Sequence, residues 1–314
     1  MKVAKDICPA CGKKEALALE TIDLEFQHRH YAPDNRSAQE SLTIAAKSSA
    51  EKYTMHKCVS CALEYAEPCI APSNSWYSLA YSLLDLYPAK RWEFDYVINN
   101  IGVKDLVGEI GCGSGSFLKK CQAKNINCHG VDFSVDAINQ CLKDNLPASL
   151  LDVVKTSFRQ DDKKTVVVSF HVLEHLDNPS QLFKLASEWS TDNATLWIAI
   201  PSNLRPTRIL NEADYLDQPP HHLTRWTPQA LTEIGQLNGW KLNEIIYEPI
   251  NLSTSLWWYS TRSSIYQKFP KTSLFKYTWI ERVLRYANYP SAMLKRFTAK
   301  NKMTGFTLLA KYYK

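Results

Sequence analysis

Long apolar stretches are missing from this 314-residue sequence. No window reaches the roughly 18 uninterrupted apolar residues of a membrane-spanning helix, and the N-terminal stretch MKVAKDICPACG lacks the apolar core of a signal peptide. The hydrophobic fraction of 45% is ordinary for a globular protein. These absences favour a cytoplasmic protein.

A disulfide framework is also missing, because nine cysteines is an odd number and five of them fall singly in apolar stretches. The other four form two Cys-x-x-Cys pairs. Two such pairs complete a tetrahedral Zn²⁺ site with no open position, so we expect a structural zinc on Cys8, Cys11, Cys58 and Cys61 rather than four unligated thiols. The long connection between the pairs adds only a logarithmic entropy cost. Its polar parts, residues 34–40 and 47–52, are expected to be mobile.

Short apolar runs alternate with helical patterns from about residue 104, which is typical of βαβ units. Strands are predicted at 106–110, 128–132, 148–153, 166–170, 196–200, 242–247 and 306–311. Helices are predicted at 116–124, 135–143, 179–190 and 228–238. The last strand has no crossover helix of its own and is predicted to be antiparallel. The expected fold is α/β: a doubly wound, seven-stranded, mostly parallel Rossmann-like sheet with a small N-terminal zinc-binding module.

Composition divides the chain into four regions. We expect a zinc-ribbon-like module at 1–70, a linker with a helix that packs on the core at 71–103, the core at 104–250 plus 305–314, and a basic aromatic helical insertion at 251–304.

Glycine is scarce, yet three of the ten glycines fall in the run Glu109-Ile-Gly-Cys-Gly-Ser-Gly115, between a strand and a helix start. Glycines there let the backbone turn tightly and approach a bulky ligand. A dinucleotide site would need glycine at 116, where this chain has Ser116. Glu109 suits the α-ammonium of an amino acid, and Asp132 suits the two hydroxyls of a ribose. Adenosine joined to an amino acid is S-adenosylmethionine, which we expect as the cofactor.

The E-x-G-x-G-x-G motif followed by Gly130-Val-Asp-Phe-Ser134 resembles class I S-adenosylmethionine-dependent methyltransferases. The resemblance covers roughly residues 100–250 plus the closing strand. It implies methyl transfer, with Asp152 as the candidate for the adenine amine and His171 lining the methionine end. The full set of expected cofactor-binding residues is Glu109, Gly111, Gly113, Gly115, Asp132, Phe133, Ser134, Asp152, Phe170 and His171.

The paired-cysteine module resembles the zinc-ribbon N-terminus of methyltransferases in bacterial surface-polysaccharide and deoxysugar pathways, where the module closes over a sugar nucleotide. The resemblance implies a small-molecule or glycan acceptor, nucleotide- or lipid-linked, with a sugar hydroxyl or carbon as the methylated atom. A motif typical of base-amine methylation, Asn/Asp-Pro-Pro-Tyr, is absent after the fourth strand, where the chain reads Ser169-Phe-His-Val172.

Three histidines are candidates for the general base. His175 follows the fourth strand, where a helical spacing would place it on one face with His171 and Glu174. His221 and His222 precede a helix that begins at Thr227-Pro228, with Thr227 as its N-cap. We slightly prefer His222 as the base; the alternative is that these histidines only hold the loop together.

The insertion at 251–304 holds ten Lys or Arg residues against one acid, Glu281, a net charge of +9. Aromatic residues interleave with the cations, and Phe275–Tyr286 is predicted to form an amphipathic helix. Such a segment fits an anionic membrane surface at the inner face. A helical lid over the sheet and a nucleic-acid contact are the alternatives.

Three functions follow from these patterns. A small-molecule or glycan methyltransferase is favoured. An RNA methyltransferase would use the zinc module and the basic surface, and a non-catalytic cofactor-binding protein would use the module for docking.

Overall fold

The structure is a computed structural model that describes residues 7–47, 50–83, 91–151, 158, 162–212, 214–261, 286–287, 289–298 and 302–314. The chain divides into two compact units. Unit 1 comprises residues 1–201, 215–246 and 308–314, and unit 2 comprises residues 202–214 and 247–307.

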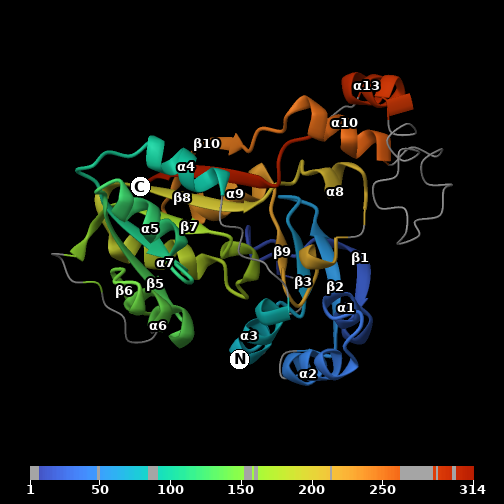
Figure 1. The fold of residues 1–314 in the computed structure, drawn as a ribbon, viewed down its shortest axis with the longest axis horizontal. Helices are drawn as coiled ribbons and strands as arrows, with labels where there is room; N and C mark the ends of the chain where they lie inside the picture. Colours follow the sequence, from blue (N-terminus) through green and yellow to red (C-terminus); the bar gives the residue numbers. More distant parts are fainter. Residues whose placement is uncertain are drawn as a thin grey trace. The chain divides into compact units, whose positions relative to one another are not determined.

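The larger sheet has seven strands in the order β10-β11-β8-β7-β4-β5-β6 (Figure 1). Its strands are β4 (Leu106–Ile110), β5 (Asn127–Asp132), β6 (Ala148–Leu150), β7 (Lys164–Phe170), β8 (Ser190–Pro201), β10 (Lys241–Tyr247) and β11 (Thr307–Tyr313). Each coincides with a predicted strand, which confirms the predicted fold class. The predicted third strand extends to 152–153, which lie outside the described residues.

Strand direction also follows the prediction. The pairs β4–β5, β4–β7, β5–β6 and β7–β8 are parallel. The chain enters β11 beside the end of β8, where Ser202 N donates to Phe306 O, and leaves it beside the start of β8, where Lys314 N donates to Ala194 O. The closing strand is therefore antiparallel to β8.

Helices connect these strands near their predicted positions: α4 (Trp92–Asn99), α5 (Ser116–Ala123), α6 (Val135–Lys143), α7 (Ser180–Trp189) and α9 (Pro228–Leu237). Thr227 caps α9 as expected, because its hydroxyl accepts from Ala230 N at 3.1 Å. Ser134 caps α6 in the same way. The core beneath these helices includes a trio of rings from Phe94, Phe117 and Phe170.

A smaller sheet joins the N-terminal region to the core. Its order is β1-β2-β3-β9, drawn in blue except for β9, which follows the histidine pair (Figure 1). Its elements are β1 (Ala16–Asp23), β2 (Lys52–Cys58), β3 (Glu64–Glu67) and β9 (Thr224–Arg225), with helices α1 (Leu24–Tyr31), α2 (Arg36–Lys47) and α3 (Asn74–Leu83).

The expectation of a mobile stretch at 34–40 and 47–52 was wrong for residues 36–40, which belong to α2. Of the second stretch, Lys47 ends α2 and Lys52 begins β2, while residues 48–49 lie outside the described residues. Asn35 accepts from Ala38 N at the start of α2, and Leu42 and Ala46 are buried against Tyr53 and Trp76. The apolar residues of α2 are few but share one face, and their burial there stabilises the helix.

Unit 2 holds α8 (Pro206–Ile209), α10 (Leu252–Thr261) and α13 (Tyr289–Thr298). Leu256 and Tyr259 of α10 pack with Ala292 of α13 and Met303. The predicted amphipathic helix Phe275–Tyr286 lies outside the described residues except for Tyr286. None of the described helices is long and apolar enough to cross a membrane.

Candidate active site

A cavity of about 530 Å³ lies in unit 1, at the carboxyl ends of the parallel strands, and its volume is typical of small-molecule sites. Its walls come from the loops after β4, β5 and β7, from α3, and from the loop between β8 and β9. We call the wall of Gly111, Gly113, Asp132, Phe133 and Ser134 the glycine side. The wall of Tyr77, Tyr81, His175, His221 and His222 is the histidine side.

The glycines of the run have a left-handed backbone, with φ of 81° at Gly111, 50° at Gly113 and 80° at Gly115. A Cβ on Gly111 would lie 2.4 Å from Cγ2 of Val172, and a Cβ on Gly115 would lie 2.5 Å from Cδ1 of Leu146. Gly115 is the N-cap of α5 and is not part of the described cavity wall. The backbone conformation therefore favours glycine at all three positions, and neighbouring side chains leave no room for a Cβ at Gly111 and Gly115.

Asp132 ends β5, and two backbone donors fix its carboxylate. Gly113 N donates to Oδ2 and Ser134 N to Oδ1, both at 2.8 Å. Burial raises the pKa of Asp132, while the backbone N–H groups oppose that rise. The ring of Phe133 is 46% exposed beside it. A fixed carboxylate next to an open aromatic face suits a ribose and a purine base.

Glu109 differs from the rest of the expected cofactor set. Its side chain is 2% exposed, is not part of the described cavity wall, and has one oxygen, Oε2, without a hydrogen-bond partner. Burial, with added repulsion from Cys121 and Asp132, raises its pKa well above the usual value. Its role toward an α-ammonium stays a prediction. Asp152 lies outside the described residues.

His171 follows β7 and lines the cavity together with Phe170. Its φ is 55°, and it precedes the short 3-10 helix η2 (Leu173–His175), so the predicted helical face shared with Glu174 and His175 does not form. Instead, Nδ1 lies 3.2 Å from Oε1 of Glu174, and Nε2 lies 3.2 Å from Oε1 of Glu93. Burial alone would lower the pKa of His171, but the two carboxylates outweigh it and raise the pKa to about 9. The ring is therefore cationic at neutral pH.

Arg91 and Glu93 are site residues that the sequence reasoning missed. Arg91 precedes α4 and is the only arginine or lysine among the described residues that line the cavity. Its Nη1 lies 3.4 Å from Oε1 of Glu93, the oxygen that also contacts His171. No local motif marks these residues, because they reach the site only through the packing of α4.

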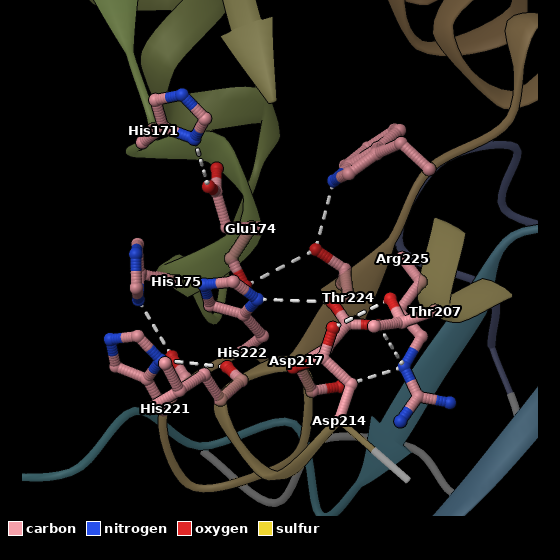
Figure 2. A network of polar contacts seen from close by, with 12 residues as sticks. His171, Glu174, His175, Thr207, Asp214, Asp217, His221, His222, Thr224 and Arg225 are labelled. Atoms are coloured by element: carbon pink, nitrogen blue, oxygen red, sulfur yellow. Dashed lines mark hydrogen bonds and ion pairs between the residues drawn. The ribbon is translucent and has the colours of Figure 1, made fainter. Parts of the chain in front are cut away.

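The three predicted histidines come together on the histidine side (Figure 2). The ring centroids of His175, His221 and His222 lie 4.5–4.8 Å apart. His175 Nδ1 contacts the His221 carbonyl at 2.6 Å, and His221 Nδ1 contacts the Leu216 carbonyl at 2.8 Å. Burial first, then repulsion from its two neighbours, lowers the pKa of His175 well below its usual value.

His222 has a different anchor from the other two rings. Its Nδ1 lies 3.1 Å from Oδ1 of Asp217 (Figure 2). A carboxylate oxygen can only accept here, so Nδ1 carries the hydrogen and Nε2 is the basic nitrogen of the neutral ring. His222 and Asp217 thus form the His–carboxylate pair that orients many general bases.

Ligand atoms of the three histidines lie within 4.8 Å of one another, a spacing that raises the question of a metal ion. An imidazole binds a metal in the plane of its ring. The rings of His221 and His222 are stacked at an angle of 16°, so their planes do not meet at a common point nearby. The geometry favours proton transfer and hydrogen bonding over metal coordination.

Strand β9 ties the histidine loop to the N-terminal module. Arg225 pairs in register with Glu64 of β3, and its Nη1 lies 3.2 Å from Oε2 of that residue. Its Nε lies 3.0 Å from Oδ2 of Asp217, the partner of His222. Two residues on, the Thr227 hydroxyl donates to the carbonyl of Cys61 at 2.8 Å.

The four paired cysteines form a compact cluster in which all sulfur atoms lie within 4.8 Å of one another. Cys8 Sγ and Cys61 Sγ are 3.5 Å apart, and Cys11 Sγ and Cys58 Sγ are 3.6 Å apart. Four thiolates around a tetrahedral Zn²⁺, with Zn–S bonds of about 2.3 Å, would be about 3.8 Å apart. The sulfur spacing fits that ion.

Residues 106–245 match the family described as "Methyltransferase domain". The matched range begins with β4 and ends in β10, so it contains the glycine run, Asp132 and the three histidines. The chain carries a class I S-adenosylmethionine-dependent methyltransferase domain. The protein is a methyltransferase enzyme, and its domain is of the class that binds S-adenosylmethionine.

No curated protein matches the sequence. Similar solved structures include a SAM-dependent methyltransferase from Archaeoglobus fulgidus, with 22% identity over 66% of this chain and 85% of that one, at a TM-score of 0.43. A possible histamine N-methyltransferase from Thermotoga maritima has 12% identity over 71% and 87%, at a TM-score of 0.44. Magnesium protoporphyrin IX methyltransferase from Synechocystis has 11% identity over 71% and 80%, at a TM-score of 0.42.

Proposed function

We propose that this methyltransferase alkylates a hydroxyl or carbon of a small-molecule or glycan acceptor, with His222 as the general base. The observation that carries the proposal is that His222, paired with Asp217, lines the same cavity as the glycine side.

The glycine side fits S-adenosylmethionine. Asp132 would accept hydrogen bonds from the ribose hydroxyls, and Phe133 would cover the purine. Gly111 and Gly113 have no side chains, so the cofactor can come close to the backbone there. Arg91 would bind the carboxylate of the methionine part, because it is the only arginine or lysine among the described residues that line the cavity. When bound, this cofactor supplies a methyl group on a sulfonium, which needs only a well-oriented nucleophile.

The histidine side would receive the acceptor. Nε2 of His222 takes the proton of the acceptor hydroxyl, and Asp217 stabilises the resulting imidazolium through Nδ1. Tyr77 lines the same wall, with its ring 5.7 Å from that of His175. Its buried hydroxyl has no hydrogen-bond partner among the described residues, so it can orient an acceptor hydroxyl.

Tritium transfer tests the proposal. The wild-type enzyme is incubated with methyl-tritiated S-adenosylmethionine and separate pools of nucleotide-linked sugars, free sugars, lipid-linked glycans and total RNA. We expect label in one of the sugar or glycan pools, and we expect His222→Asn to lower the rate by about 10²–10⁴-fold, the usual contribution of a general base.

Gln218→Asn is the matched control, because residue 218 lies on the same loop but is not part of the described cavity wall. It should keep most of the wild-type rate. Label in the RNA pool alone, or full activity in His222→Asn, would refute the proposal.

We further propose that the four-cysteine cluster holds a structural Zn²⁺. The fit of the sulfur spacing supports this, and the four thiolates would fill the coordination shell. The ion would then fix the turn at Cys61, whose carbonyl accepts a hydrogen bond from the Thr227 hydroxyl. Because Thr227 caps α9, the ion would also fix the start of that helix, which follows the histidine loop.

A further inference from the structure

Helix α13 of unit 2 exposes an apolar stripe. Met293 is 41% exposed, Leu294 is 66% exposed and Phe297 is 75% exposed. Phe297 follows Met293 by four residues and Leu294 by three, so the three side chains share one face of the helix.

A neighbouring face of α13 is the one that packs. Ala292 is buried, and Tyr289 is partly buried with it against α10. Arg296 also belongs to this face, because its guanidinium hydrogen-bonds the Ser255 hydroxyl of α10. A helix of a globular protein usually turns its large apolar residues inward. In α13 the fully buried residue is Ala292, whereas Leu294 and Phe297 face solvent, which marks a surface for an external partner.

The charge of the helix and of the sequence segment that contains it indicates the partner. Helix α13 contains Lys295 and Arg296 and no acidic residue, and the sequence segment 251–304, to which it belongs, carries a net charge of +9. Two further apolar side chains of α10, Leu252 and Trp257, are exposed in the same unit. Phosphate groups of a nucleic acid would pair with the cations but not with Met, Leu and Phe side chains. An anionic bilayer surface takes both, since apolar rings and chains enter the headgroup region while lysine and arginine meet the lipid phosphates.

We propose that α13 binds an anionic membrane surface, with Leu294 and Phe297 inserted among the lipid headgroups and Lys295 beside them. None of the described residues that line the cavity belongs to α13, so the proposal does not depend on the function proposed above. It would hold the enzyme at a membrane without a spanning segment.

Vesicle sedimentation of the full chain tests this. The probes are vesicles of pure phosphatidylcholine and vesicles in which roughly a third of the lipid is phosphatidylglycerol. We expect the wild type to pellet with the acidic vesicles at low salt and less at high salt. Leu294→Ser/Phe297→Ser should lower the partition coefficient at least about tenfold, because both insertion contacts are lost.

The matched control is Ile44→Ser/Leu237→Ser, which removes two equally exposed apolar side chains from unit 1 and should leave sedimentation unchanged. Both variants should keep the wild-type melting temperature and affinity for S-adenosylhomocysteine. Failure of the wild type to pellet at low salt overturns the proposal, and so does an equal loss in both variants. If Leu294→Ser/Phe297→Ser abolishes a homodimer or RNA retention while vesicle binding is absent, the stripe serves that other partner and the lipid proposal is wrong.

Discussion

His171 is cationic at neutral pH because Glu93 and Glu174 both face its ring. Burial raises the cost of charging all three groups, yet the hydrogen bonds and charges of His171 lower the pKa of both carboxyls. The result is a chain of ion pairs from Arg91 through Glu93 and His171 to Glu174. His175, the next residue, is neutral. His171 and His175, which line the same cavity, therefore hold different charges, and the cationic His171 cannot serve as a base.

The stability contributed by His171 should disappear at alkaline pH. Its folded pKa of about 9 exceeds the ordinary value of 6.5, so the contribution is complete below pH 6.5 and is lost as pH rises through 9. We expect His171→Asn to reduce the free energy of unfolding by about 3 kcal/mol at pH 6 and by much less at pH 9.5. Urea denaturation at both pH values measures this; an equal loss at both would contradict the assigned charge.

Gly111 and Gly239 form a matched pair for testing the glycine run. Their φ values are 81° and 78°, but a Cβ on Gly111 meets Val172 while a Cβ on Gly239 meets nothing within 4 Å. We expect Gly239→Ala to cost about 1 kcal/mol of unfolding free energy and Gly111→Ala about 3 kcal/mol, because only the latter adds a collision. Chemical denaturation measures both unfolding free energies. Equal losses in the two variants would show that Val172 moves away from the added Cβ at no cost.

Sequence spacing predicted part of the site and missed the rest for a physical reason. Asp132 and the histidines lie directly after strands or in the loop before a capped helix, where periodicity locates them. Arg91 and Tyr77 reach the cavity from helices outside the βαβ pattern, and only tertiary packing brings them there. Likewise, no local pattern reveals the positive φ of His171 or the contacts of its ring with Glu93 and Glu174.

Strand β9 (Thr224–Arg225) links two parts of unit 1. It is two residues long, yet its Arg225 contacts both Glu64 of the N-terminal module and Asp217, the partner of His222. Hydrophobic periodicity cannot reveal a strand this short. By contrast, β4 and α6 have the predicted limits, because each is a regular run bounded by glycine, serine or charged residues.

Arg225→Gln should remove the ionic contacts that join Glu64 of the N-terminal module to Asp217, the partner of the proposed base His222. The change leaves Asp217 and Glu64 buried without their cation, and we expect a loss of about 3 kcal/mol in unfolding free energy. The methyl-transfer rate should fall while S-adenosylhomocysteine affinity stays within about twofold, since the glycine side is untouched.

Arg36→Gln is the control for that change, because Arg36 pairs with Glu40 on the exposed surface of α2. It should cost less than about 0.5 kcal/mol. A similar loss in both variants would show that the buried position of Arg225 has no special role.

At the scale of the whole molecule, the N-terminal module and the methyltransferase sheet belong to one compact unit. The module supplies α3 to the cavity wall and receives β9 in its sheet. Unit 2 joins residues 202–214 to residues 247–307, and no local pattern could reveal an association across that sequence distance. The order of the seven strands was predictable only from the resemblance to a known fold.

Zinc removal should therefore affect the whole of unit 1. We expect one zinc per chain by elemental analysis, and a strong chelator should lower the melting temperature and the methyl-transfer rate together. Cys8→Ser/Cys61→Ser should reproduce both effects, whereas Cys69→Ser, outside the cluster, should show neither. A zinc-free protein with unchanged melting would contradict the structural role.

The division of the cavity into a cofactor side and an acceptor side is the centre of this account, and calorimetric titration with S-adenosylhomocysteine tests it most directly. We predict that Asp132→Ala weakens binding at least about tenfold, since the ribose loses a fixed carboxylate, and that His222→Asn leaves it within about twofold. Equal weakening by both substitutions, or wild-type affinity in Asp132→Ala, would contradict the assignment.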